Sequence, residues 1–222
     1  MTEATPSASL LVESSLDIRS LFPTPVTIVT LKDHAALDAE LTRLILTRAE
    51  THPSVLRSNL GGWQSDTDFE SWAGPAGATV LAAARQLANM VTAVSGPDGL
   101  NRAEMPWRIN AWANLNRAGN GNEMHTHGGS YWSGAYYVND GLDGAAEQPG
   151  GEFEVLDPRG VAPQMYAPQL KMAVKGCLTA GLSEYLTPRS GQLYLFPAWL
   201  FHGVRPYRGS GTRISIAFNL CL

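Results

Sequence analysis

Cysteine is scarce in this chain, and so are long apolar runs. Only Cys177 and Cys221 among the 222 residues are cysteines, too few for the disulfide framework of a small secreted domain. No apolar run approaches the ~18–20 residues that span a bilayer. Residues 1–15 lack the basic and apolar regions of a secretory signal. We therefore expect a cytoplasmic protein with no membrane partner.

Basic charge is sparse as well. The 16 Lys and Arg residues are spread thinly and are outnumbered by 20 Asp and Glu residues, which gives a formal net charge of −4. A nucleic-acid partner is not expected, because binding to phosphates needs a clustered basic surface. What the chain does have is apolar content: 44% of its residues are hydrophobic, enough to bury a full core.

The length favours one domain with some helical decoration. Residues 1–15 are rich in Ser, Thr and Ala and predict a flexible N-terminus. A single domain is expected over 16–222, with a strand and buttressing helices in 16–105 and a β-rich core in 106–222. Helices first and strands afterwards are typical of an α+β fold, here mainly β, with a sandwich or barrel packed against the helices.

The segments before the core predict one strand and two helices. Residues 22–31 carry β-branched side chains and predict a strand. Apolar residues spaced three and four apart predict a helix over 33–50. A second helix is expected to begin at Pro75 and to end at the dipeptide Gly96-Pro97.

Two segments of the core alternate between apolar and polar side chains, namely 107–116 and 212–221. Such alternation places the two kinds on opposite faces of a strand. The apolar faces are expected to pack against a layer, while the polar faces either meet solvent or line a cavity. A cavity is favoured because Arg213 and Ser215 share a polar face and follow closely on His202.

The histidines form the most informative pattern. His125 and His127 are one residue apart, and His202 follows 77 residues after His125. Two such neighbours on a strand can hold one metal together, and a distant third ligand closes a facial triad like that of mononuclear non-haem iron. Taken singly, a His-x-His pair is more often a surface accident and a histidine in an apolar strand a core residue. Three of only five histidines in this arrangement, with Arg213 behind them, favour a metal site.

Four segments carry a resemblance to the double-stranded β-helix 2-oxoglutarate/Fe(II) oxygenases, and within these to a poorly characterised bacterial family. They are "SNLGGWQSDTDF" (58–69), "HTHGGSYWSGAYYVN" (125–139), "GGEFEVLDPR" (150–159) and "GQLYLFPAWLFHGVRPYRGSGTRISIAFNL" (191–220). The similarity extends over roughly residues 22–222. It implies a jelly-roll, cupin-like barrel with helices supporting one sheet.

The function implied by the resemblance is that of a dioxygenase with Fe(II) as metal and 2-oxoglutarate and O₂ as co-substrates. It would oxidise, by hydroxylation, a C–H bond of a small-molecule or amino-acid-like substrate, and convert 2-oxoglutarate to succinate and CO₂. The sequence leaves open the prime substrate, the choice between hydroxylation, desaturation and cyclisation, and whether the protein is a homodimer.

The ligand pattern departs from the superfamily at one position. The superfamily has His-x-Asp or His-x-Glu where this chain has His125 and His127. We expect a site of three histidines, completed by His202, as both the metal ligands and the catalytic centre. Glu123, by its parity with the pair, and Asp157, if its loop folds back, are alternative carboxylate ligands.

The co-substrate site is expected around Arg213. Its planar, permanently charged guanidinium suits the distal carboxylate of 2-oxoglutarate. Ser215 shares its face and offers a hydroxyl donor. The resemblance adds Tyr137 and Asn114 as further 2-oxoglutarate contacts.

Two alternatives remain open at this stage. One is a cupin-like metalloenzyme that uses the three histidines without 2-oxoglutarate. The other is a non-catalytic β-barrel binding module. Arg213 argues against the cupin, which has no need of a buried arginine at that spacing, and the intact histidines argue against the binding module.

Overall fold

The computed structural model describes residues 14, 16–142, 150–161 and 165–222, so the flexible N-terminus expected over 1–15 lies almost wholly outside the described part. Three helices and thirteen strands are found in these residues: β1(Thr27–Thr30), α1(His34–Thr51), β2(Asn59–Leu60), β3(Trp63–Gln64), α2(Phe69–Trp72), α3(Gly74–Val91), β4(Val94–Gly96), β5(Gly99–Asn101), β6(Arg108–Asn116), β7(Gly121–His125), β8(Trp132–Asn139), β9(Phe153–Leu156), β10(Ser183–Leu186), β11(Gln192–Pro197), β12(His202–Val204) and β13(Arg213–Cys221).

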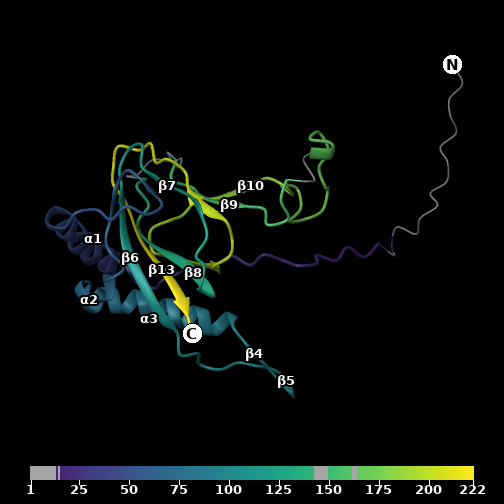
Figure 1. The fold of residues 1–222 in the computed structure, drawn as a ribbon, viewed down its shortest axis with the longest axis horizontal. Coiled ribbons are helices and arrows are strands. Elements are labelled where there is room, and N and C mark those ends of the chain that lie inside the picture. Colours follow the sequence, from purple (N-terminus) through teal and green to yellow (C-terminus); the bar gives the residue numbers. More distant parts are fainter. Residues whose placement is uncertain (1–13, 15, 143–149, 162–164) are drawn as a thin grey trace, which may run out of the picture.

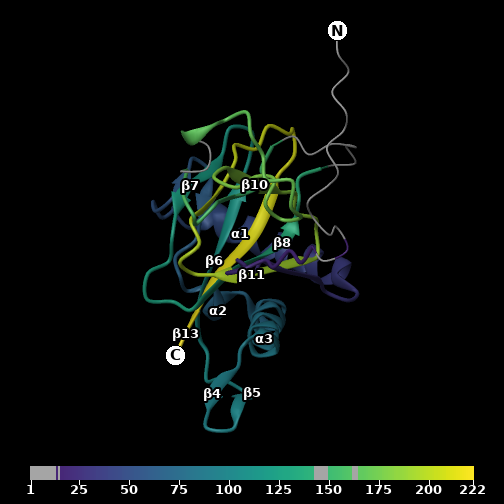
Figure 2. The ribbon, with the colours of Figure 1, turned by 90° about the vertical axis from the view of Figure 1, so that its right-hand side faces the viewer.

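Two antiparallel sheets form the body of the molecule (Figure 1). The larger sheet has the strand order β1-β11-β8-β13-β6-β3, and the smaller has the order β10-β9-β12-β7-β2. Strands β4 and β5 form a separate hairpin that projects from the end of α3 (Figure 2). Apart from β9 and β10, neighbours in the larger and the smaller sheet are not consecutive strands of the chain, as expected for a jelly-roll barrel.

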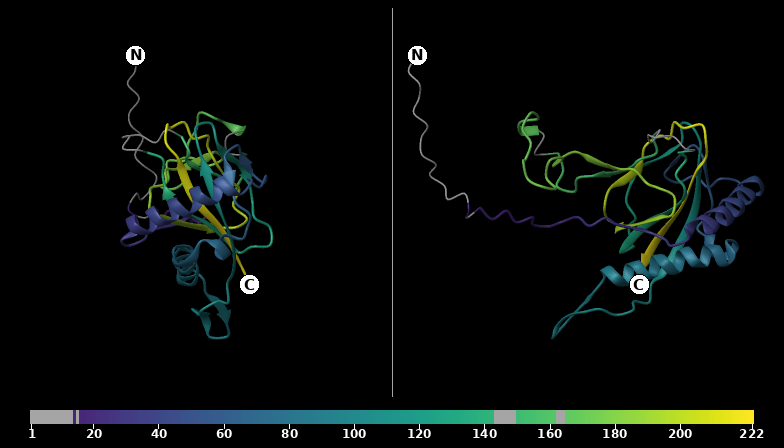
Figure 3. Two further views of the ribbon diagram at one scale, coloured as in Figure 1. Left: turned by 90° about the vertical axis from the view of Figure 1, so that its left-hand side faces the viewer. Right: turned by 180° about the vertical axis from the view of Figure 1, so that it is seen from behind.

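Helices α1 and α3 cover the outer face of the larger sheet (Figure 3). The predicted alternation explains why. The apolar faces of β6 and β13 point toward the helices and form one buried cluster with α1 and α3, to which Ala111, Ala113, Leu115, Ile214, Ile216, Phe218 and Leu220 belong. The polar faces of the same strands are thereby turned into the barrel. None of the helices in the described residues has the length and apolar character needed to cross a bilayer.

The second long helix ends earlier than the sequence predicts. It begins at Gly74 with Pro75 in its first turn, as expected, but its last residue is Val91. Thr92 is extended, and its hydroxyl donates to the Ala88 carbonyl at 2.6 Å and accepts from the Trp132 indole at 2.9 Å. A β-branched residue held in this way stops the helix. The dipeptide Gly96-Pro97 then serves the turn of the β4–β5 hairpin rather than a helix end.

A long segment between β9 and β10, from Asp157 to Leu182, projects from the barrel on the side away from the helices (Figure 3). We call it the β9–β10 arm, of which residues 162–164 are not described. Its two ends are joined, since the Asp157 N–H donates to the Leu182 carbonyl at 3.2 Å. Strand β9 pairs with β12, so the arm leaves the barrel beside the strand that begins with His202.

Candidate active site

The smaller sheet places two of the predicted ligands opposite each other. His125 is the last residue of β7 and His202 the first of β12, and the two are register partners on neighbouring antiparallel strands. His127 lies two residues beyond the end of β7. Its backbone N–H donates to the Ala198 carbonyl at 2.9 Å, and this bond holds the segment after β7 against the residue that directly follows β11.

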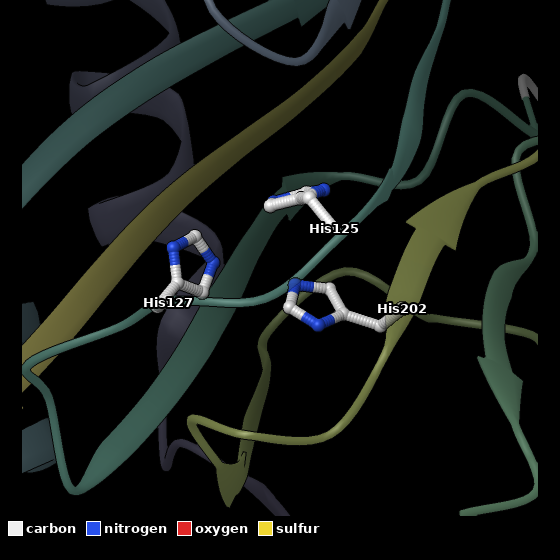
Figure 4. Close-up of side chains that lie close together, drawn as sticks. All are labelled: His125, His127 and His202. Atoms are coloured by element: carbon white, nitrogen blue, oxygen red, sulfur yellow. The ribbon is translucent and has the colours of Figure 1, made fainter.

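The three imidazoles converge (Figure 4). Ring centroids are 4.8 Å apart for His125 and His127, 4.5 Å for His125 and His202, and 5.1 Å for the remaining pair. One nitrogen from each ring lies within 4.8 Å of the others, so the cluster can hold a single metal ion.

Two of the rings have a fixed orientation. The Nδ1 of His125 is 2.7 Å from the Glu123 carbonyl, and the Nδ1 of His202 is 2.8 Å from the Leu200 carbonyl. A carbonyl accepts only, so Nδ1 carries the proton in both rings and Nε2 is the nitrogen available to a metal. This support of the second nitrogen is typical of metal-binding histidines.

Burial keeps the rings neutral. It lowers the pKa of His202 to about 3, and burial together with the neighbouring His125 lowers the pKa of His127 to about 4. The pKa of His125 is lowered by burial as well. Phe153 and Phe196 lie against the His202 ring, with centroids 5.4 and 4.6 Å away. Neutral imidazoles are the form that binds a metal, so the donor set fits a divalent cation such as Fe(II).

Neither of the alternative carboxylates joins the cluster. Glu123 is exposed, and the group of potential ligands among the described residues contains only the three histidines. The Asp157 carboxylate is taken up elsewhere: it accepts from the Arg159 guanidinium at 2.8 Å and from the Gly181 N–H at 2.7 Å. In the described residues the ligand set is therefore purely imidazole.

The larger sheet supplies the other candidates. Arg213 is the first residue of β13, and Ser215 is the register partner of both Asn114 on β6 and Tyr137 on β8. All four of these residues line the same cavity as the three histidines. The structure thus brings the predicted metal ligands and the predicted 2-oxoglutarate contacts to one cavity, with the histidines on the smaller sheet or its loop and the rest on the larger sheet.

Two of the donors of Arg213 lack partners. It is 1% exposed, and its Nε and Nη2 have no hydrogen-bond partner. No carboxylate of the described residues lies within 4.0 Å of it. The face of the Tyr137 ring is 5.1 Å from the guanidinium carbon, a cation–π contact. Asn114 also has an unpaired buried atom, its Oδ1.

Sequence reasoning missed one polar contact of the cluster. Asn219 on β13 lies with its Nδ2 3.4 Å from the Nδ1 of His127. A signal was present, because Asn219 has the same parity as Arg213 and Ser215 and so belongs to the face that lines the barrel. The alternation does not, however, reveal which residue of another segment it meets.

Solved structures with a similar fold are double-stranded β-helix oxygenases. A prolyl-4-hydroxylase from Pseudomonas putida is 17% identical, with a TM-score of 0.57 over 89% of this chain and 92% of that one. A Trichoplax adhaerens prolyl hydroxylase, solved with a peptide of hypoxia inducible factor, is 12% identical, with a TM-score of 0.59 over 88% and 83%. HygX from Streptomyces hygroscopicus, solved with nickel and 2-oxoglutarate, is 15% identical, with a TM-score of 0.56 over 89% and 83%. The fold is therefore the expected double-stranded β-helix.

The sequence itself matches a family model. Residues 110–219, about half of the chain, match the family described as "Putative 2OG-Fe(II) oxygenase". The chain belongs to this family and is an enzyme of the 2-oxoglutarate/Fe(II) oxygenase class. Fe(II) and 2-oxoglutarate are the cofactors that give the family its name, and O₂ is its usual co-substrate. No curated protein matches the chain.

Proposed function

We propose that the protein is a non-haem Fe(II)/2-oxoglutarate-dependent dioxygenase that hydroxylates a C–H bond of a small-molecule or amino-acid-like substrate. His125, His127 and His202 hold the metal, and Arg213, Ser215, Tyr137 and Asn114 hold 2-oxoglutarate. Residues 16–222 form one oxygenase domain, which acts in the cytoplasm.

The observation that carries this proposal is that two donors of the buried Arg213, Nε and Nη2, have no partner. A buried charge with no counter-ion is strongly unfavourable, and such groups normally find a partner. Nε and Nη2 can donate two parallel hydrogen bonds, and a ligand carboxylate can accept both of them. Since Arg213 lines the cavity that also holds the three histidines, a ligand with one end on the metal and a carboxylate at the other suits this space. 2-Oxoglutarate has that shape, and a cupin without this co-substrate would leave the guanidinium unexplained.

The residues around the metal have separate tasks. The three imidazoles occupy one side of an ion and leave its remaining positions for ligands. Phe153, Phe196 and Trp112 line the cavity beside them and exclude water from it. Bound there, Fe(II) supplies the O₂ activation that couples decarboxylation of 2-oxoglutarate, to succinate and CO₂, with oxidation of the substrate.

The substrate class is the finer part of the proposal. Related structures include HygX with hygromycin B bound and a prolyl hydroxylase with a peptide bound. We favour a small or amino-acid-like substrate, as the sequence resemblance implies.

An anaerobic titration tests the proposal. The Fe(II)-loaded protein is titrated with 2-oxoglutarate and followed by visible absorption. Chelation of the metal by the 2-oxo acid should produce a metal-to-ligand charge-transfer band that saturates with one equivalent. The same titration of His202→Ala, which lacks a proposed ligand, should give no band.

Two results would contradict the proposal in different ways. Tight Fe(II) binding with no band at any 2-oxoglutarate concentration would favour the cupin-like metalloenzyme. Absence of metal binding in the wild-type protein would reject the three-histidine site.

A further inference from the structure

His127 is the one ligand candidate whose ring has no backbone support. His125 and His202 each fix Nδ1 against the carbonyl two residues earlier in the chain. The Nδ1 of His127 instead lies 3.4 Å from the side-chain amide of Asn219, which comes from a different strand 92 residues later.

Asn219 is itself held in place. Its side chain is 9% exposed, and its Oδ1 accepts a hydrogen bond of 2.7 Å from the hydroxyl of Ser133, which is 1% exposed. The two residues are register partners on β13 and β8. Because both strands belong to the centre of the larger sheet, the carboxamide has a rigid base.

On the strength of the proposed function, we propose that Asn219 is a positioning residue that orients the imidazole of His127 for metal binding through Nε2. A neutral ring that gives Nε2 to a metal carries its proton on Nδ1, and this proton needs an acceptor. Asn219 is the polar side chain that the structure places at Nδ1.

A carboxamide suits this task because its two ends have the same shape. With Oδ1 on Ser133, the amide presents Nδ2 to an unprotonated Nδ1. Turned by 180°, it presents Oδ1 to a protonated Nδ1, while Nδ2 donates to the Ser133 oxygen, which accepts as well as donates. Asn219 can thus support the ring both before and after a metal takes Nε2.

The His127 ring also has an aromatic neighbour. The Trp112 ring lies 5.8 Å from the His127 ring, centroid to centroid, at an interplanar angle of 56°. The indole limits where the imidazole can lie but not how it rotates about its own axis. The contact with Asn219 supplies that missing restraint, so the two residues together define the position of Nε2.

The test compares metal affinities. Co(II) is titrated into the full chain and followed by its visible absorption. Asn219→Leu, which keeps the volume but removes the acceptor, should weaken binding by about 10–100-fold. Asn219→Asp should keep the wild-type affinity, because its oxygens accept from Ser133 and from the protonated Nδ1 together. Asn110→Leu is the matched control: Asn110 is the exposed register partner of Asn219 on β6, and its replacement should leave the affinity unchanged.

A second readout reports on the bond itself. NMR spectra of the Zn(II)-loaded protein should show a slowly exchanging Nδ1 proton on His127, and Asn219→Leu should lose it. The 2-oxoglutarate affinity of Asn219→Leu at saturating Co(II) should match that of wild type, since only the metal ligand is affected. If Asn219→Leu fails to fold, Ser133→Ala replaces it and should weaken Co(II) binding by roughly 3–10-fold, the effect of one lost hydrogen bond.

The inference is overturned if Asn219→Leu binds Co(II) as tightly as wild type, or if Asn219→Asp loses as much affinity as Asn219→Leu. A wild-type protein that binds no Co(II) would instead reject the proposed function. The two failures are therefore distinguishable.

Discussion

Arg213 shows how one side chain can define the chemistry of a cavity. Its burial lowers the pKa of the guanidinium, yet arginine keeps its charge at any physiological pH. The charge has aromatic contact with Tyr137 but leaves two donors unused. These two donors are unsatisfied in the free protein, and a ligand carboxylate would satisfy both of them.

The first prediction is that Arg213→Ala raises the KM for 2-oxoglutarate. Losing one partner of a buried, hydrogen-bonded charge pair costs about 2–5 kcal/mol, so the increase should be on the order of 10²-fold. Metal affinity should stay near that of wild type, because the histidines lie on the other sheet. Steady-state kinetics with varied 2-oxoglutarate and a Co(II) titration measure the two quantities.

Arg205→Ala provides the control, since Arg205 is half-exposed and pairs with Glu154 rather than lining the cavity. An unchanged KM in Arg213→Ala would show that the co-substrate lies elsewhere.

At the scale of single residues, the sequence predicted which residues belong to the site better than it predicted which residues contact one another. Spacing brought His125 and His127 together, and strand parity placed Arg213 beside Ser215. Asn219 was not predicted as a site residue, because its role depends on a loop 92 residues away. Glu123 was suspected by parity alone, but the register of the β7–β12 pairing shifts between Asn122 and His125, and Glu123 is exposed.

Besides its apolar packing, helix α1 is hydrogen-bonded to the larger sheet through one carboxylate. Asp38 is 8% exposed; it accepts from the Tyr136 hydroxyl at 2.6 Å and lies 2.6 Å from the Nδ1 of His34. Tyr136 is on β8, directly before Tyr137, and points to the opposite face. The bond thus fixes the helix to the strand that carries a proposed co-substrate residue on its other side.

The second prediction is that Asp38→Ala destabilises the fold by about 1–3 kcal/mol, because the Tyr136 hydroxyl would stay buried without an acceptor. Chemical denaturation measures the free energy of unfolding. Glu40→Ala on the same helix, which breaks only the exposed pair with Arg43, should change the free energy of unfolding much less than Asp38→Ala does. Adding Tyr136→Phe to Asp38→Ala should recover part of the loss. A cost equal to that of Glu40→Ala would refute the anchoring role.

The β9–β10 arm is closed at its base by another carboxylate. Asp157 accepts from the Gly181 N–H at 2.7 Å and from Arg159, and so joins the first residue of the arm to one near its last. The hydrogen bond from Arg159 lowers the pKa of Asp157 from 3.8 to about 2, against the effect of burial.

The third prediction concerns pH. A carboxyl group with a depressed pKa stabilises the folded state above its unfolded pKa and loses this contribution as pH falls through the folded value. Protection of the Gly181 amide from hydrogen exchange should therefore be full above pH 4 and decline toward pH 2. Asp157→Ala, which has no acceptor for the Gly181 N–H, should show low protection at every pH, and comparison at matched pH removes the intrinsic pH dependence of exchange. Equal protection of the Gly181 amide in the variant and the wild-type protein at pH 5 would disprove that Asp157 closes the base of the arm.

The regular elements were the easier part to predict. Strands β6 and β13 follow the alternation almost to the residue, and α1 follows its apolar stripe. The β4–β5 hairpin was missed, because Val94 continues the helical spacing and the side-chain bonds of Thr92 that end the helix involve Trp132, a tertiary contact. The spacing of apolar residues predicts which face of a helix or strand is buried, whereas the residue at which the element ends depends on tertiary contacts.

At the scale of the whole molecule, the residues of the site come from both sheets. His125 and His202 belong to the smaller sheet, whereas Arg213, Ser215, Tyr137 and Asn114 belong to the larger one. A co-substrate that reaches from metal to guanidinium would connect the two sheets across the cavity. Binding should then stabilise the barrel as a unit and not only one wall of it.

The fourth prediction is a stepwise rise in Tm. Ni(II) alone should raise it, and 2-oxoglutarate should raise it further only when the metal is present. At a concentration of about 100 Kd, each ligand contributes roughly 2.7 kcal/mol, which corresponds to roughly 5–10 °C for a domain of this size. In Arg213→Ala the metal increment should persist while the 2-oxoglutarate increment falls at the same concentration, and in His202→Ala both should vanish. Calorimetry resolves the increments. A rise with 2-oxoglutarate in the absence of metal, undiminished in Arg213→Ala, would mean that the ligand binds outside this cavity and does not connect the sheets.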